Sequence, residues 1–189
     1  MWIAFDGANN MCGHKTGVFA RLKAEKCPES EYVHCRSHLL QLACVNACEK
    51  LKPIKSLFSA INSLYRLFST SPKRAHALKE VQEALQDPSL SLVHAGDTKW
   101  TSHYQSVKAV VKCLRSIITT LQHLHQDSGN LSSEAGGLLL MFQDKQSITL
   151  LFGVKDILEP ICRLSAKLQN QSATLYDFPD LLEAALARL

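Results

Sequence analysis

The sequence predicts a mostly α-helical protein with a small β element near its beginning. Apolar residues recur at three- and four-residue intervals over most of the 189-residue chain. Two short apolar runs in the first 36 residues are typical of strands instead. The small numbers of Gly (8) and Pro (6) argue against a turn-rich all-β fold. The length suits one domain, or two small pieces, with a real hydrophobic core.

The β element is expected to hold two strands and one helix. Residues 2–5 form an apolar run that ends at the turn signal Asp6-Gly7, and residues 31–35 are the second strand candidate. Residues 17–26 have helical spacing up to Pro28, which stops the helix. Because a lone pair of short strands is not stable unaided, we expect this chain to be a piece of something longer.

Helices are expected to dominate after residue 36. The first proline of a segment can begin a helix, as at Pro53 and Pro72, whereas Pro160 should kink its helix or mark an early turn. Asp177 is the expected cap of the last helix. The predicted helices cover residues 37–51, 53–68, 72–86, 102–126, 133–142, 147–168 and 178 onward, with a connector at 88–100.

Charge is uneven along the chain, which has a formal net charge of +4. Residues 1–126 carry 16 Lys and Arg against 9 Asp and Glu, whereas residues 127–189 carry 5 against 8. A basic first part suggests a face for a polyanion, although a solvated helical surface would give the same count. No apolar stretch of about 18 residues is present, so a membrane span is not expected.

The seven cysteines indicate a reducing compartment, because their number is odd and no secretory signal precedes them. In the run His34-Cys35-Arg36-Ser37-His38, a thiolate and an imidazole lie three residues apart, and with Cys44 and Cys48 on the following helix they could in principle surround a zinc ion. Their spacing matches no common zinc frame, so we expect buried thiols beside a hydrogen-bonded histidine, and no metal.

Three further local features could carry chemistry. Asp6 ends a strand, where a carboxylate can hold a metal ion, or simply makes an Asp-Gly turn. Lys99 and Trp100 precede a helix, where they suit phosphate contact and base stacking, or an aromatic anchor on the core. Lys73 and Arg74 form a basic helix start, which could equally be a solvated first turn.

Taken in order, these features resemble the hAT superfamily of DNA transposases. The likeness extends over essentially the whole chain and lies nearest to the hAT-derived vertebrate proteins of the zinc finger protein 862 and zinc-finger MYM-type group. Lys99 stands where the family usually has arginine. The residues that carry the resemblance are Asp6-Gly7-Ala8 with Met11, Gly13 and Gly17, then Cys35-x-x-His38, then Phe68-x-x-Ser71-x-Lys73-Arg74, and Asp97-Thr98-Lys99-Trp100.

The resemblance implies an RNase H-like catalytic core interrupted by an α-helical insertion domain. Residues 1–36 would be a partial core, and residues 37–189 the insertion domain, truncated at the C-terminus. By the same resemblance Asp6 is a vestigial catalytic carboxylate, Cys35 and His38 belong to the segment beside the active site, and Trp100 stacks on DNA.

We therefore expect a catalytically inactive remnant of a domesticated transposase. Two-metal phosphoryl transfer needs several carboxylates, and by the resemblance Asp6 is the one carboxylate of the catalytic set in this chain. Mg²⁺ or Mn²⁺ would therefore bind only if the missing carboxylates were supplied elsewhere. The expected location is the nucleus, with weak, salt-dependent DNA association through Arg36, Lys73, Arg74, Lys99 and Trp100. The alternative is a helical module for a protein partner or self-association, without nucleic-acid binding.

Overall fold

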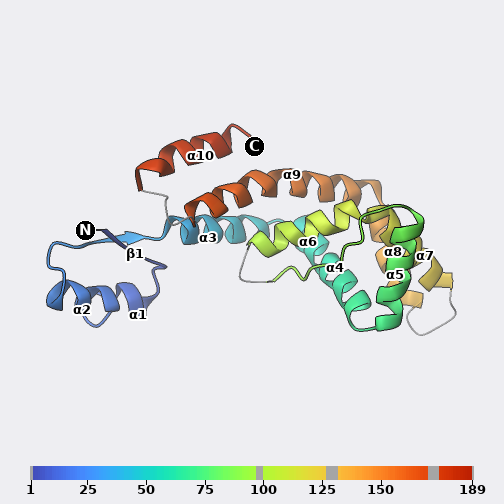
Figure 1. The fold of residues 1–189 in the computed structure, drawn as a ribbon, viewed down its shortest axis with the longest axis horizontal. Coiled ribbons are helices and arrows are strands. Elements are labelled where there is room, and N and C mark those ends of the chain that lie inside the picture. The colour runs from blue at the N-terminus through green and yellow to red at the C-terminus, as the bar shows by residue number, and fades with distance from the viewer. Residues whose placement is uncertain (1, 97–99, 127–131, 170–174, 189) are drawn as a thin grey trace.

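The computed structural model describes residues 2–96, 100–126, 132–169 and 175–188 (Figure 1). Within these ranges it contains ten α-helices, one short 3-10 helix and two strands. The prediction of a mostly α-helical protein with a small β element is confirmed. Among the described helices, none has both the length and the apolar character that crossing a bilayer requires.

The N-terminal unit is a small α/β element. Strands β1 (Trp2–Phe5) and β2 (Glu31–His34) pair in parallel, with Phe5 opposite His34. Helices α1 (Asn9–Cys12) and α2 (Val18–Glu25) form the crossover that parallel strands need. The sheet packs through aromatic rings, since Tyr32 lies 6.5 Å from Phe5 and 5.6 Å from Phe19, measured between ring centroids.

The helical part begins directly after β2 and makes up the rest of the molecule. Its first helix, α3, begins at Arg36, one residue before the predicted start. The helices of this part are α3 (Arg36–Glu49), α4 (Lys52–Ser69), α5 (Pro72–Ala84), α6 (Trp100–Lys112), α7 (Leu114–Gln126), α8 (Ser132–Gln143), α9 (Lys145–Leu168) and α10 (Phe178–Leu186), with the 3-10 turn η1 (Leu175–Asp177) before the last.

One apolar core holds α4 to α9 together. Its members lie at helical spacing on the inward faces, which is the periodicity that predicted helices in this part of the chain. Helix α6 packs against α9, and α7 packs against α8 and α5. The largest side chains that are less than 2% exposed are Phe142, Leu57, Ile61, Leu64, Ile117, Leu121 and Leu151.

The single helix predicted over residues 102–126 is wrong. The chain turns at Cys113, between α6 and α7, and the Cys113 amide lies within hydrogen-bond distance of the carbonyls of both Ala109 and Val110. The Cys113 thiol donates to the Pro88 carbonyl at 3.5 Å. The turn sends α7 to a different partner from α6, although apolar residues continue at helical spacing across it.

Pro160 does not interrupt its helix, so the early turn expected there is absent. Helix α9 is continuous from Lys145 to Leu168, and Pro160 is buried within it. The proline removes one main-chain hydrogen bond, the one to the carbonyl of Asp156, without ending the helix.

Two contacts near the start of α3 join distant parts of the chain. The Gln169 amide donates to the Ser37 hydroxyl at 3.2 Å, and the Arg36 guanidinium lies 5.3 Å from the ring centroid of Phe178. These contacts attach the C-terminal end of α9 and the first residue of α10 to the residues that follow β2. The division at residues 36 and 37 into a partial core and an insertion domain stays a prediction.

Candidate functional site

The ends of the two parallel strands bring Asp6 and Cys35 next to each other in the sheet. The Cys35 amide donates to the Phe5 carbonyl at 2.8 Å, which extends the strand pairing by one residue. The Asp6 carboxylate accepts a hydrogen bond of 3.1 Å from the Ala8 amide. Asp6 therefore also has the local turn role that an Asp-Gly pair favours.

His34, the first residue of the His34–His38 run singled out from the sequence, completes this corner. Its Nε2 atom lies 3.0 Å from the Asp6 carbonyl oxygen, and its ring stacks with that of His38 at 6.0 Å between centroids. Gly7 adopts a φ of +83°, and a Cβ atom there would lie 2.6 Å from the His34 ring. The sequence does not show that His34 lies opposite Phe5, because only the strand pairing reveals this register.

The residues at this corner do not fit a two-metal centre. Within the described ranges, no three His, Cys, Asp or Glu side chains come together in a way that could hold a metal ion. The set Cys35, His38, Cys44 and Cys48 is included in that finding. Paired cations need several converging carboxylates, and in the described part of the chain Asp6 does not belong to such a group.

One cysteine of α3 and one of α9 line the same small cavity. Cys44 and Cys162 both line a space of about 150 Å³. Burial, with a smaller contribution from Cys44, raises the pKa of Cys162 to about 11, and burial also raises the pKa of Cys44. Because the thiolate is the reactive form, these two thiols are poor nucleophiles and poor metal ligands at neutral pH.

Two of the predicted DNA-contacting residues make contacts within the molecule. Arg74 donates from Nε to the Leu67 carbonyl at 2.5 Å and from Nη2 to the Thr70 hydroxyl at 2.9 Å, so it satisfies the C-terminal end of α4. Arg36 lies over the Phe178 ring. Lys73, by contrast, is exposed at the start of α5.

A hydrogen bond joins the residues on either side of the Lys99–Trp100 motif. Lys99 lies outside the described residues, and Trp100 is the first residue of α6, with its side chain outside the description. Just before the motif, the Gly96 amide donates to the Ser102 hydroxyl at 3.2 Å. Gly96 and Ser102, which are described residues on either side of the motif, are thus held together.

The predicted site residues are not gathered into one site. Figure 1 shows β1 near one end of the long axis and α5 near the other. Asp6 follows β1, whereas Lys73 and Arg74 begin α5. The strand-end corner and the basic helix start are therefore separate places on the molecule.

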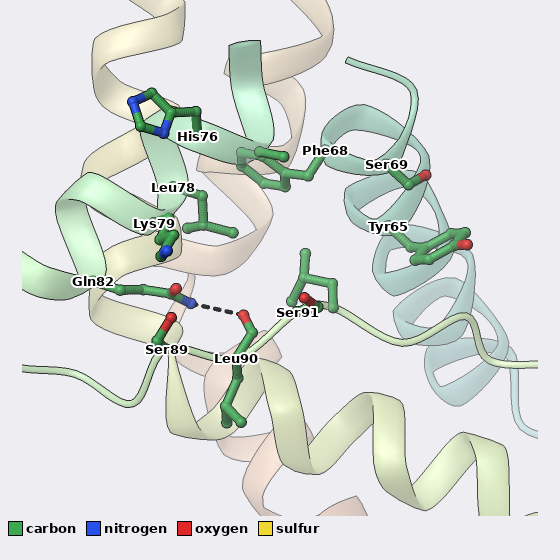
Figure 2. Close-up of a pocket in the computed structure, with 12 residues that line it drawn as sticks. Tyr65, Phe68, Ser69, His76, Leu78, Lys79, Gln82, Ser89, Leu90 and Ser91 are labelled. Carbon is green, nitrogen blue, oxygen red and sulfur yellow. Dashed lines mark hydrogen bonds between the residues drawn. The ribbon is translucent and has the colours of Figure 1, made fainter. Parts of the chain in front are cut away.

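A cavity of about 540 Å³ lies between α4, α5 and the connector (Figure 2). The side chain of Gln82, only 2% exposed, donates from Nε2 to the Leu90 carbonyl at 2.9 Å across this cavity. Its walls are mainly apolar and its rim carries serines with His76 and Lys79. His76 and Lys79 lie 3.4 and 3.8 Å from Glu80 and Glu83 on their own helix.

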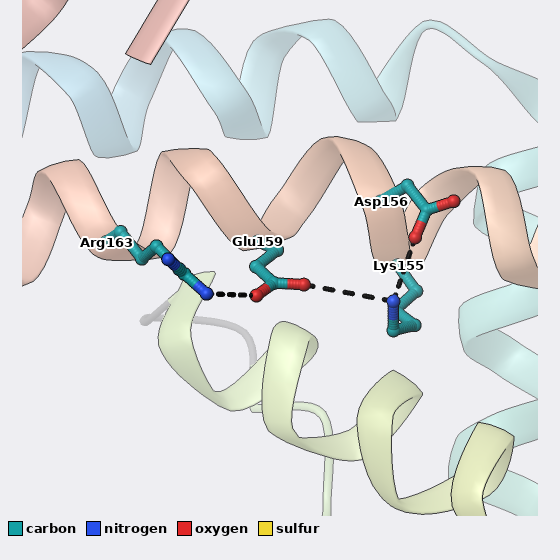
Figure 3. Close-up of polar contacts among 4 residues, drawn as sticks. All are labelled: Lys155, Asp156, Glu159 and Arg163. Atoms are coloured by element: carbon teal, nitrogen blue, oxygen red, sulfur yellow. Dashed lines mark hydrogen bonds and ion pairs between the residues drawn. The ribbon is translucent and has the colours of Figure 1, made fainter. Parts of the chain in front are cut away.

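Charges on α9 neutralise one another (Figure 3). Glu159 accepts from Arg163 at 2.6 Å and lies 3.8 Å from Lys155, and Lys155 lies 2.8 Å from Asp156. The hydrogen bond from Arg163, aided by the charges of Arg163, Lys155 and Lys108, lowers the pKa of Glu159. Two cations and two carboxylates thus leave this part of α9 without a net charge.

Comparison with known proteins assigns the helical part. Residues 33–137 match the family model of the ZBED1 RNase-like helical domain, which is more than half of the chain. The chain belongs to this family. The matched segment begins within β2 and reaches into α8, so the ZBED1 RNase-like helical domain contains most of the core described above. No solved structure matches the chain.

Membership in the ZBED1 RNase-like helical domain family confirms the broader resemblance stated from the sequence, to proteins derived from hAT-type transposases. The match includes Cys35 and His38, the basic start of α5 and the Lys99–Trp100 motif. Asp6 precedes it.

Proposed function

We propose that this chain is a catalytically inactive, transposase-derived helical domain that associates weakly with the DNA backbone in the nucleus. The observation that carries the proposal is the charge of the matched segment. Residues 33–137 hold twelve Lys and Arg against seven Asp and Glu. In a domain descended from a DNA-processing enzyme, such an excess suits contact with phosphates that does not depend on base sequence.

The inactivity is proposed from ligand chemistry. RNase H-type phosphoryl transfer places two cations between several carboxylates. Asp6 accepts a local backbone hydrogen bond, and in the described part of the chain no acidic or metal-ligating group of three forms around it. The test is incubation of labelled duplex DNA with the chain and Mg²⁺ or Mn²⁺. No nicking is expected, and metal-dependent nicking that Asp6→Ala abolishes would contradict the proposal.

The DNA association is tested by titration of a labelled duplex at 50 and 200 mM salt. Weak binding that falls steeply at the higher salt is expected, because each phosphate contact releases counterions. Substitution of Trp100 by Ala should weaken binding to a single strand by about 1–3 kcal/mol if its ring stacks on a base. Imaging of the tagged chain tests the nuclear location, and cytoplasmic retention would contradict it.

A finer lineage is also proposed. The residues Cys35-x-x-His38 and Asp97-Thr98-Lys99-Trp100 support descent within the zinc finger protein 862 and zinc-finger MYM-type group. A phylogeny of helical-domain sequences tests this, and placement of the chain among other hAT-derived groups would refute it.

The second candidate function is a protein-interaction module. Leu140 on α8 and Ile157 on α9 are 74% and 52% exposed, which is high for large apolar side chains. Single exposed apolar residues are nevertheless common on soluble domains, so this role ranks second. Light scattering over a range of concentrations would favour it by showing self-association, and a clean monomer with no binding of a hydrophobic dye would weaken it.

A further inference from the structure

One stretch of the chain, around α4, is rich in positive charge and almost free of acids. Residues 36–74, which include α3 and α4, carry seven Lys and Arg and a single acidic residue, Glu49. The next acidic residue along the chain is Glu80. Helix α4 itself contains no carboxylate at all. A cation on α4 can therefore be neutralised only by an acid from another element.

The cations of α4 lie on one face of the helix. Lys52, Lys55 and Arg66 are three and eleven residues apart, which are close to whole numbers of helical turns, so they share a side. All three are exposed, whereas the opposite side of the helix is buried in the core through residues such as Ile61 and Leu64. We call this side, defined by Lys52, Lys55 and Arg66, the α4 basic face.

The α4 basic face is not neutralised by the rest of the described chain. No described carboxylate lies within 4.0 Å of these three cations. Arg66 donates only to the Ser63 hydroxyl among the contacts seen, at 3.1 Å. The cations Lys155 and Arg163 of α9 differ, because each pairs with an acid on its own helix (Figure 3). Exposed cations on α4 are thus available to an external anion.

The same face adjoins the connector that leads to the Lys99–Trp100 motif. Asn62 lies between Lys55 and Arg66 along α4, and its side chain holds Ala95 by two hydrogen bonds of 2.9 and 3.2 Å. Ala95 is followed by Gly96, which is tied to Ser102 of α6. The segment that the family resemblance assigns to DNA therefore starts from an anchor on α4.

We propose that the α4 basic face is the surface that holds the backbone of duplex DNA. This inference rests on the proposed DNA association and specifies where on the molecule it occurs. Lys52 and Arg66 are separated by roughly 21 Å along the helix axis, at 1.5 Å per residue. A duplex presents phosphates all along that length, so three cations in a row can each meet one, without reading the base sequence.

The test compares three forms of the full chain by titration of a labelled duplex at several salt concentrations. The first variant combines Lys52→Gln, Lys55→Gln and Arg66→Gln. The expected result is an affinity about tenfold or more below wild type at 50 mM salt, and a slope of log affinity against log salt that is smaller by about 2.7, since each phosphate contact contributes about 0.9. Circular dichroism establishes that the variant is folded.

A matched control removes the same charge elsewhere. Arg21→Gln, Lys23→Gln and Lys26→Gln alter three exposed cations on or next to α2, and should leave the affinity near that of wild type. Lys52→Arg with Lys55→Arg keeps the charge on α4 and should also bind as wild type does.

The outcomes separate the two proposals. If wild type does not bind duplex DNA at 50 mM salt, the proposed function fails. If wild type binds and the α4 variant binds equally well, or if the α2 control weakens binding as much, the proposed function stands and the α4 basic face is refuted. A clear preference for duplex RNA that depends on the same three cations would also overturn the assignment to DNA.

Discussion

The side-chain amide of Asn62 pairs with both main-chain groups of Ala95, as a neighbouring β-strand would. Its Oδ1 atom accepts from the Ala95 amide at 2.9 Å, and its Nδ2 atom donates to the Ala95 carbonyl at 3.2 Å. Ala95 is buried, at 1% exposed, so its polar groups depend on these partners. One residue of α4 thereby fixes the path of the connector.

Substitution of Asn62 by Ala should lower the free energy of unfolding by about 2 kcal/mol. Two hydrogen bonds are lost, at about 0.5–1.5 kcal/mol each, and buried main-chain groups are left unpaired. Urea denaturation followed by circular dichroism measures the change. Ser59→Ala, an exposed position on the same helix, is the control and should stay within about 0.5 kcal/mol of wild type. Equal stability of the two variants would show that the connector does not depend on the two hydrogen bonds of Asn62.

Substitution of Gly7 by Ala should loosen the strand pair. The left-handed backbone at φ +83° costs a non-glycine residue about 1–2 kcal/mol, and the added methyl group meets the His34 ring at 2.6 Å. Hydrogen exchange at the amides of β1 and β2 should become faster. Unchanged exchange would mean that His34 can move away freely.

Substitution of Gly137 on α8 by Ala should stabilise the protein, in contrast to the substitution of Gly7. Nothing lies within 4 Å of a Cβ atom built there, and the residue is helical and exposed. Gly137→Ala is expected to stabilise the protein by about 0.5–1 kcal/mol, because alanine loses less backbone entropy in a helix. Urea denaturation measures this gain, and a destabilised variant would contradict the packing described for α8.

The ion pair between Glu159 and Arg163 should make stability depend on pH. The hydrogen bond from Arg163 lowers the pKa of Glu159 below its ordinary value of 4.5. A carboxyl group with a lowered folded-state pKa stabilises the protein above the unfolded-state pKa, and this contribution is lost as the pH falls through the folded-state pKa. Glu159→Gln should therefore be less stable than wild type at pH 7, and the difference should shrink towards about pH 3.

Thermal unfolding of wild type and Glu159→Gln at the two pH values checks this expectation. A difference in melting temperature that is the same at both would indicate that Glu159 contributes through packing and not through its charge.

Cys162 should resist alkylation in the folded protein. Its pKa of about 11 leaves roughly one thiol in a thousand ionised at pH 8, and the side chain is 7% exposed. Mass spectrometry after brief treatment with iodoacetamide should find Cys162 unmodified and Cys27, which is half-buried in a loop, modified. Addition of urea should make the two react alike, and rapid labelling of native Cys162 would show that α3 and α9 separate readily.

The sequence predicted the elements whose periodicity is strong and whose ends carry their own signals. Helix α5 is an example, since Ser71 accepts a hydrogen bond from the Arg74 amide at 3.4 Å and Pro72 begins the helix. The turn at Cys113 could not be predicted, because apolar residues continue at helical spacing across it. It is decided by tertiary contacts of α6 and α7 with different helices.

The candidate site was predictable only in part. The position of Asp6 at a strand end and of Cys35 beside it follows from the strand pattern and the resemblance. The basic character of Arg74 suggested phosphate contact, whereas its side chain satisfies carbonyl and hydroxyl groups of α4. The α4 basic face was present in the sequence as a stretch almost free of acids, but its solvent exposure depends on which side of α4 the core occupies.

Helix α3 packs against α9, and a hydrogen bond between Ser37 and Gln169 joins the two segments. This packing has a consequence for biosynthesis. Ribosomes add about 5–20 residues per second, so α3 leaves the exit tunnel roughly ten seconds before its partner exists. During that interval the thiols of Cys44 and Cys48 remain uncovered on the nascent polypeptide.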